Sequence, residues 1–490
     1  MNPVLTHFES WCSIPHPSGH TETMQSYLKQ FAAAQQLECV TDAAGNVLIR
    51  KPAAPGHEDA PVVALQAHID MVPQPLDGRD WTTEPVRMRW IAKGGDSEFP
   101  DAALLKAEGT TLGADCGIGA CAMLVLLSGN EPAPALECLF TVDEETGMHG
   151  ANQLSPHWLK ARYMLNLDTE SEGVLMTGCA GAVDLTARFR YGLSTVVPDG
   201  DKAIMLRLSG LQGGHSGMDI HMGRGNACKL MCRFLKQAVV NFEARLASFQ
   251  AGSLRNAIPR EAEAVITVPG EIAEEVLAEA AYYNDLFREE LRGIDPDVLF
   301  RAEQCALPAA LMPEEIQDDI LNTVEAAHDG VFRYSPDIPG LVETSSNLAS
   351  VTTRLISDSR QPAGETEILC LIRSQNEEMK RWLASSLQST FLLGGARVEF
   401  GSSYPGWDLP ADSELLTKAK SVYQQTFDRA PVVAGVHCGL ECGVISALYP
   451  RMDILSFGPT IHHPHSPNES VEIESVDRFW TFLKALLASF

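Results

Sequence analysis

The stretch Leu65-Gln66-Ala67-His68-Ile69-Asp70-Met71-Val72 ends an apolar run, residues 61–68, that predicts a buried strand. Open α/β sheets place their ligand sites at the carboxyl ends of such strands. Because side chains alternate along a strand, His68 and Asp70 share one face, where the imidazole can bind a metal ion and the carboxylate can accept its other N–H. An H-x-D pair by itself still favours an ordinary polar loop, so the interpretation depends on the rest of the chain.

A glycine-rich turn presents the next candidate carboxylate. In TLGADCGIG (residues 111–119), Asp115 precedes a predicted helix of small and apolar residues. The plain alternative is helix capping, for which Asp is a favoured residue. A phosphate-binding loop is not favoured, because no Lys-Ser/Thr pair follows the glycines.

Carboxylates also close two further predicted strands. TVDEETG (residues 141–147) contains Glu144 and Glu145, which repel each other and, if buried, need a cation or a shared proton. One of the pair can ligate a metal ion while its neighbour acts as general base. LNLDTE (residues 165–170) presents Asp168 at a strand end in the same way. A solvated acidic turn and a capping aspartate are the plain alternatives for these two segments.

Near the C-terminal end, GPTIHHPHSP (residues 458–467) places three histidines between prolines, which can hold imidazoles rigidly. The prolines and the predicted strand before this segment argue against a histidine tag or a low-complexity tract. The spacing alone does not decide which of His462, His463 and His465 binds a ligand.

Together these segments favour a metal centre more strongly than any one of them. Several predicted strands end in His, Asp or Glu, as a cluster of nitrogen and oxygen ligands requires. Five such ligands, one of them shared, would hold two zinc-type ions with room for a water between them. The sequence therefore predicts a dinuclear metallohydrolase.

Composition excludes several classes of protein. The 490 residues include 37 Lys and Arg against 64 Asp and Glu, a formal net charge of -27, which disfavours nucleic acid and anionic membranes as partners. The longest apolar run, residues 120–127, is far shorter than the ~18 residues of a membrane span. The first residues lack a signal-peptide pattern, and the 12 cysteines form no C-x-x-C pair. We therefore expect a cytoplasmic protein with reduced thiols.

The predicted elements indicate an α/β domain interrupted by an insertion. Residues 1–182 alternate helices with short apolar strands, and this pattern returns in residues 404–490. Apolar strands without alternation predict a central mixed sheet that helices flank on both faces. Residues 183–403 form an inserted α+β domain in which the order of strands and helices recurs, so we expect a doubled module there. Three consecutive domains are the alternative.

The motifs together carry a family resemblance. AHIDMV, LGADCGIG, VDEETG, LNLDTE, GGHSG and HSP resemble, in this order, the co-catalytic zinc metallopeptidases that include aminoacylases, glutamate carboxypeptidases and peptidase T. IPHPSGH, SLRNAIPREA, GLECG and SFGPTIHHPHSPNE are similar to the aminoacyl-histidine dipeptidase (peptidase D) branch of that family. The resemblance covers nearly the whole chain. It implies a catalytic domain (1–182 and 404–490), a lid or dimerisation-type domain (183–403), and hydrolysis of unblocked dipeptides, including Xaa-His and carnosine-like ones.

The resemblance also implies the metal ligands. His68, Asp115 and Asp168 would hold one Zn²⁺, and Asp115, Glu145 and His465 would hold the other, with Asp115 bridging. Mn²⁺ or Co²⁺ can substitute at such nitrogen and oxygen ligands.

Further roles follow from the same resemblance. Glu144 would be the general base that deprotonates the water and later passes the proton to the leaving amine, and Asp70 would orient His68. Cys116 departs from the family pattern, which usually has Asn after the bridging Asp. We expect this change to tune the site and not to abolish it, because the ligand itself is retained.

The inserted domain would supply groups that bind substrate. His215, in GGHSG, matches the lid histidine that contacts the tetrahedral oxyanion in this family. Asn256 and Arg373 are expected to anchor the peptide backbone and the C-terminal carboxylate. A capped turn is the plain alternative for His215, and a salt bridge is the plain alternative for Arg373. Relatives with a single lid module borrow this histidine from a dimer partner. A doubled lid would instead complete the site within one chain, so a homodimer is possible but is not expected to be required for catalysis.

Two other functions remain as alternatives. The same scaffold could support an N-acyl-amino-acid deacylase or a tripeptidase, and a free amino group in the substrate would distinguish a dipeptidase from a deacylase. A noncatalytic metal-binding protein is less favoured, because metal binding alone does not require the base Glu144.

Overall fold

A computed structural model of the chain describes residues 2–490 except 75, 77–79, 81–82, 195, 357–362 and 411. The chain divides into two compact units. Unit 1 comprises Met1–Cys179, Trp407–Gly435 and Leu440–Phe490, and unit 2 comprises Ala180–Gly406 and Val436–Gly439. No helix in the described part of the chain is long and apolar enough to cross a membrane. The division of labour between a catalytic domain (1–182 and 404–490) and a lid (183–403) stays a prediction.

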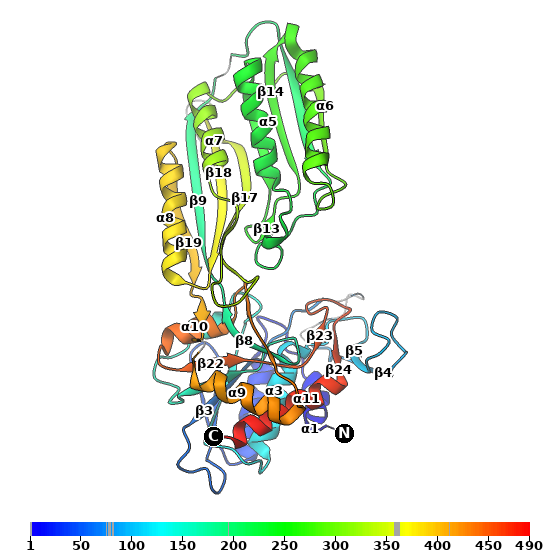
Figure 1. Ribbon diagram of the computed structural model, residues 1–490, viewed down its shortest axis with the longest axis vertical. Helices are drawn as coiled ribbons and strands as arrows, with labels where there is room; N and C mark the ends of the chain where they lie inside the picture. Colours follow the sequence, from blue (N-terminus) through cyan, green and yellow to red (C-terminus); the bar gives the residue numbers. More distant parts are fainter. Residues whose placement is uncertain are drawn as a thin grey trace. The chain divides into compact units, whose positions relative to one another are not determined.

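Unit 1 is built on a nine-stranded mixed sheet, which confirms the predicted α/β class (Figure 1). Its central strands run parallel, since β3 pairs in parallel with both β6 and β7, and β22 pairs in parallel with β7. Every residue of β3, β6 and β7 is buried, as apolar strands covered on both faces require. The strand order is β1 (Glu38–Thr41), β2 (Val47–Lys51), β6 (Leu136–Thr141), β3 (Val63–His68), β7 (Tyr163–Asn166), β22 (Asp453–Ser456), β8 (Val174–Cys179) and β20 (Trp407–Asp408), with β21 (Val432–Val436) beside β8.

Helices of unit 1 pack in two groups. In one group, α1 packs against α3 and α11, and α11 packs against α9, while α3 and α9 contact β3 and β22. In the other group, α10 packs against α4 and contacts β22 and β8. Helix α2 belongs to neither group and contacts β1 and β2. The bounds of these helices are α1 (Pro3–Cys12), α2 (Glu22–Ala34), α3 (Ala114–Ser128), α4 (His149–Asn152), α9 (Glu414–Phe427), α10 (Glu441–Leu448) and α11 (Ile473–Ala488).

Small residues let α3 approach the sheet closely. A Cβ added at Gly119 would lie 2.6 Å from the carbonyl oxygen of Leu167, so only glycine permits this contact. Gly113, just before the helix, has φ +72°, a left-handed conformation that favours glycine. The start of α3 is therefore held against the segment that follows β7.

A second, four-stranded sheet of unit 1 supports the segment with the three histidines. Its order is β23 (Ile461–His462), β24 (Ser470–Glu472), β5 (Leu104–Ala107) and β4 (Met88–Ile91). β23 and β24 pair in antiparallel fashion, so residues 463–469 form the connection between them.

Unit 2 contains one nine-stranded antiparallel sheet with helices packed beside it (Figure 1). Residues of the sheet and of all four of its α-helices form one large apolar core. The first strand, β9, pairs with β18 and β19, so it belongs with the strands from the end of the unit. The two halves meet where three residues of β12 pair with β17. The strand order is β15 (Leu299–Cys305), β10 (Asp201–Ser209), β14 (Ala262–Pro269), β12 (Arg245–Gly252), β17 (Val342–Ile356), β18 (Ala363–Ser374), β9 (Gly181–Gly192) and β19 (Arg397–Tyr404), with β16 (Gly330–Tyr334) beside β17.

The helices of unit 2 are α5 (Ala227–Phe242), α6 (Ala273–Glu290), α7 (Glu314–Ala326) and α8 (Glu377–Leu393), and a separate pair of short strands is formed by β11 (Gly214–His215) and β13 (Ala257–Ile258). In one half of the sheet α5 contacts β14 and α6 contacts β15, and in the other half α8 contacts β9, β18 and β19. The fourth helix, α7, contacts one strand of each half, β12 and β9. The two halves each contain strands and helices in similar number, but they are not consecutive in the sequence. The first strand of the unit, β9, pairs within the second half.

Candidate active site

The carboxyl ends of three adjacent parallel strands carry most of the predicted site residues. β3 ends at His68, β6 is followed by the loop with Glu144 and Glu145, and β7 is followed by Asp168. Because these strands are parallel and in register, their carboxyl ends meet at one edge of the sheet. Asp115 reaches the same edge from the start of α3.

Asp115 lies between two imidazoles. Its Oδ1 is 3.2 Å from Nε2 of His68, and its Oδ2 is 3.0 Å from Nε2 of His465. A second carboxylate lies beside each histidine. Oδ1 of Asp168 is 3.3 Å from Nε2 of His68, and Oε1 of Glu145 is 2.9 Å from Nε2 of His465. The two oxygens of one buried carboxylate thus serve two separate histidine–carboxylate pairs.

The structure distinguishes the three histidines near the C-terminal end. His462 stacks on Phe99 and its Nε2 lies 2.9 Å from Glu472. His463 contacts Glu98, 2.8 Å away. Among the three, only His465 is found against Asp115 in the described part of the chain.

Two carboxylate oxygens of the cluster are buried without a hydrogen-bond donor. They are Oδ1 of Asp168 and Oε1 of Glu145, which lie near the imidazoles but not in hydrogen-bonding geometry. Potential ligand atoms of His68, Asp115 and Glu145 lie within 4.8 Å of one another. Nitrogen and oxygen donors at such spacing, with unsatisfied acceptors, fit divalent cations of the zinc type.

Electrostatics at this edge are dominated by crowded carboxylates. Burial opposes a charge on His68, yet Asp168, Asp115 and Asp70 hold its pKa well above the usual value. The carboxylates of Asp115 and Glu145 beside its Nε2 raise the pKa of His465 to about 11. Burial raises the pKa of Glu144 well above its usual range. The cluster therefore attracts positive charge strongly, either as protons or as bound cations.

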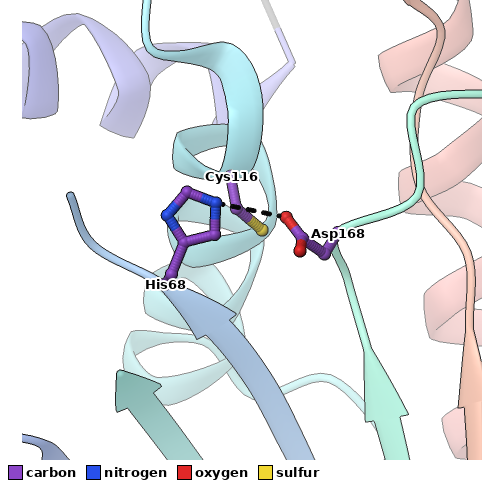
Figure 2. A group of neighbouring side chains, drawn as sticks. All are labelled: His68, Cys116 and Asp168. Atoms are coloured by element: carbon purple, nitrogen blue, oxygen red, sulfur yellow. Dashed lines mark ion pairs between the residues drawn. The ribbon is translucent and has the colours of Figure 1, made fainter. Parts of the chain in front are cut away.

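Cys116 follows Asp115 and lies beside His68 and Asp168 (Figure 2). Its Sγ donates to the carbonyl oxygen of Leu167 at 3.3 Å. Burial raises the pKa of this thiol well above its usual value, and Asp168 adds to the rise. The expected tuning of the site by Cys116 stays a prediction.

Asp70 contacts His68 mainly through its main chain. Nδ1 of His68 lies 2.9 Å from the carbonyl oxygen of Asp70 and 3.5 Å from its Oδ1. The carboxylate accepts hydrogen bonds from the backbone N–H of Glu144 (3.0 Å), the backbone N–H of Glu145 (3.3 Å) and the hydroxyl of Ser18 (2.8 Å). Asp70 therefore also holds the loop that carries the two glutamates.

Sequence reasoning assigned no role to several buried residues near the site. Gln66 donates to Thr141 and to Glu441, at 3.0 and 2.6 Å, and Asn166 donates to Gln66 at 2.6 Å, which links β6, β3 and β7 just below the site. The signal was present, because Gln66, Asn166 and Glu441 lie in the stretches LQAHIDMV, LNLDTE and GLECG. Those motifs supported the resemblance without suggesting what the residues contact.

The three remaining predicted residues belong to unit 2. Nδ1 of His215 accepts hydrogen bonds from the backbone N–H groups of Gly217 and Met218, both at 3.2 Å, so the proton of the neutral ring is on Nε2. Burial lowers the pKa of His215, and the charge of Arg373 adds to this effect. His215 and Asn256 line one cavity of about 870 Å³ within this unit.

Arg373 is a buried cation with neutral partners. Only 4% of it is exposed, and it donates to the hydroxyls of Ser216 (3.3 Å) and Tyr404 (3.0 Å). The positive charge of Arg373 opposes the rise that burial causes in the pKa of Asp184. The carboxylate of Asp184 itself lies 3.4 Å from Arg255 and forms its ion pair there. No carboxylate among the described residues forms an ion pair with Arg373, so the salt-bridge alternative is not favoured.

Comparison with known proteins identifies the family. Residues 64–489 match the model of peptidase family M20/M25/M40. The chain belongs to this family. It is 40% identical over 488 residues to the cytosol non-specific dipeptidase of Escherichia coli (strain K12), a match that covers 99% of this chain and 97% of the relative.

Solved structures agree with this assignment. The aminoacylhistidine dipeptidase from Vibrio alginolyticus superposes with a TM-score of 0.89 at 39% identity, over 100% of this chain and 96% of that chain. Aminopeptidase PepT from Bacillus cereus, with a TM-score of 0.61 at 14% identity over 99% of this chain and 97% of that chain, shares the fold. The M20 chain is thus a hydrolase acting on peptide bonds, which confirms the predicted enzyme class.

Replacing Asp70 by Asn tests the link between this residue and the glutamate loop. Three donors share the two carboxylate oxygens, and an amide offers only one oxygen, so a buried N–H loses its acceptor. We expect kcat to fall at least about tenfold in a folded protein, as is typical when a group that orients a metal site is changed. The measurement is kcat together with metal content.

Asp143→Asn is the matched control. Asp143 accepts one N–H, from Gly19 at 2.7 Å, and an amide oxygen can replace that acceptor. Its kcat should stay near the wild-type value. A kcat for Asp70→Asn equal to that of the control would contradict the role given to Asp70.

Proposed function

We propose that this M20 peptidase is a dinuclear metal dipeptidase that hydrolyses unblocked dipeptides, including Xaa-His. The observation that carries the proposal is Asp115, whose two oxygens face two histidine–carboxylate pairs. The names of the two relatives, at 40% and 39% identity over nearly the whole chain, support small dipeptides as substrates. The name of the first also supports a cytoplasmic location.

The donor set supports a specific division of ligands. His68, Asp115 and Asp168 would hold one ion, and Asp115, Glu145 and His465 would hold the other, which satisfies the buried oxygens of Asp168 and Glu145. We propose Zn²⁺, with Mn²⁺ or Co²⁺ as substitutes. When bound, such ions lower the pKa of a water and polarise the scissile carbonyl.

Glu144 is the proposed general base. No hydrogen bond or ion pair engages its carboxylate among the described residues, so it is free to accept a proton. Its backbone is held by Asp70, which fixes the loop on which it lies. In the proposed reaction Glu144 takes the proton of the attacking water and then delivers it to the leaving amine.

Unit 2 would supply substrate-binding groups. The neutral His215, with its proton on Nε2, suits a hydrogen bond to the developing oxyanion. Arg373, a buried cation without a carboxylate partner among the described residues, suits the C-terminal carboxylate of a dipeptide. Asn256, in the same cavity as His215, would contact the peptide backbone. Whether the chain also forms a homodimer stays open.

Release of histidine from Ala-His tests the proposal. Metal-stripped protein should be inactive, and addition of Zn²⁺, Mn²⁺ or Co²⁺ should restore cleavage. N-acetyl-histidine and a tripeptide should remain uncleaved in parallel assays. Cleavage of the acetylated compound would indicate a deacylase, cleavage of the tripeptide alone would indicate a tripeptidase, and no hydrolysis with any metal would contradict the proposal.

Glu144→Gln tests the assigned base. The amide is nearly the same shape but cannot accept the proton, so kcat should fall by about 10²–10⁴-fold. Metal content should stay equal to wild type, because Glu144 is not among the proposed ligands. Glu98→Gln, an exposed change beside His463, is the control and should keep wild-type kcat. Persistent turnover by Glu144→Gln would overturn its role.

A further inference from the structure

Glu469 binds the loop that leads to Asp115. It is buried, with 2% of its surface exposed, and its carboxylate accepts four backbone N–H groups. Oε2 accepts from Leu112 at 2.7 Å and Gly113 at 2.9 Å, and Oε1 accepts from Ala114 at 2.8 Å and Asp115 at 3.4 Å. The carboxylate is thus in direct contact with the backbone of the residue that lies between the two histidines.

These N–H groups need an acceptor from elsewhere in the chain. The first N–H groups of a helix have no carbonyl partner within it. Gly113, at the cap position of α3, has no side chain to accept them, and Asp115 has non-helical φ and ψ of -82° and 113°. Glu469 supplies the missing acceptor, and a carboxylate forms stronger hydrogen bonds to backbone N–H groups than a neutral acceptor does.

The same residue belongs to the segment that carries His465. Glu469 follows His465 by four positions, immediately before β24, and its backbone N–H closes the turn by donating to the carbonyl oxygen of Ser466 at 3.0 Å. One side chain therefore ties the turn of His465 to the loop of Asp115. Across this tie, His465 Nε2 and Asp115 Oδ2 lie 3.0 Å apart.

We propose that Glu469 is a positioning residue of the metal centre, which sets the separation of His465 and Asp115 and thereby the affinity for the ion they share. The inference rests on the proposed function, because it presumes that these two residues are ligands. It goes beyond that function by naming a residue that touches neither metal nor substrate. A carboxylate is required, since its two oxygens offer acceptor sites for all four donors and a Gln side chain would turn an NH₂ group toward two of them.

Glu469→Gln tests the inference. Metal-stripped protein would be titrated with Zn²⁺ against a chromogenic chelator, and kcat and KM for Ala-His would be measured at saturating Zn²⁺. We expect the affinity for one of two ions to fall about 10–100-fold, as is typical when a residue that orients a ligand is lost. We also expect a lower kcat with KM close to wild type.

Glu137→Gln is the matched control for simple loss of stability. Glu137 is also 2% exposed and accepts two backbone N–H groups, from Lys160 at 2.7 Å and Ala161 at 3.0 Å. It lies near the start of β6, whereas the site follows the end of that strand. This variant should unfold at a lower temperature but keep both Zn²⁺ affinities and kcat within about twofold of wild type, because no ligand segment is attached to it.

The outcomes separate the inference from the proposed function. Wild-type protein that binds no metal would contradict the proposed function. Wild-type protein that binds two ions, with Glu469→Gln showing the same affinities and kcat, would overturn the role of Glu469 alone. Glu469→Asp, which keeps the charge with a shorter reach, gives a second folded variant with the same expected direction. Failure of both Glu469 variants to fold, while Glu137→Gln folds, would also overturn the inference, because the residue would then serve the fold and not the metal centre.

Discussion

Mutual repulsion among buried carboxylates is the constraint on which unit 1 depends. Asp70, Asp115, Glu145 and Asp168 are gathered at one sheet edge, and two of their oxygens are buried without a hydrogen-bond donor. Such a cluster is stable only if positive charge is supplied and if each carboxylate is held in place. Protonated imidazoles on either side of Asp115 supply this charge when no metal ion is bound. In the metal-bound protein the proposed cations would supply it instead, because an imidazole that ligates a metal ion is neutral.

The fold holds these groups in place with backbone hydrogen bonds as much as with side-chain packing. Asp70 fixes the loop of Glu144 and Glu145 through their N–H groups, and Glu469 fixes the loop of Asp115 in the same manner. Parallel pairing of β3 with β6 and β7 brings the strand ends together, and Gly119 lets α3 approach the segment after β7. These contacts hold the loops of the site in position, as a site that must keep ligand distances requires.

Local patterns predicted a large part of this arrangement, because a buried strand followed by a polar residue is visible within a few positions of sequence. His68, the glutamate pair and Asp168 were found in this way, and the α/β class followed from the same strands. The spacing of His462, His463 and His465 could not show which of them faces Asp115. The backbone conformation decides where each side chain points, and His463 and His465 have left-handed φ angles of 50° and 57° that no sequence pattern indicated. The pairing of β9 with β18 and the tie from Glu469 to Asp115 could not be predicted, because the partners are about 180 and 354 residues apart and no local pattern encodes them.

Counting the zinc ions bound by wild-type protein and by Asp115→Asn tests the central claim most directly. The measurement is elemental analysis of each folded protein after saturation with Zn²⁺ and removal of the excess. The account predicts two ions per wild-type chain and at most one in Asp115→Asn, because an amide offers one oxygen where the carboxylate faces two histidines. Two ions in Asp115→Asn, or fewer than two in the wild type, would contradict a centre bridged by this residue.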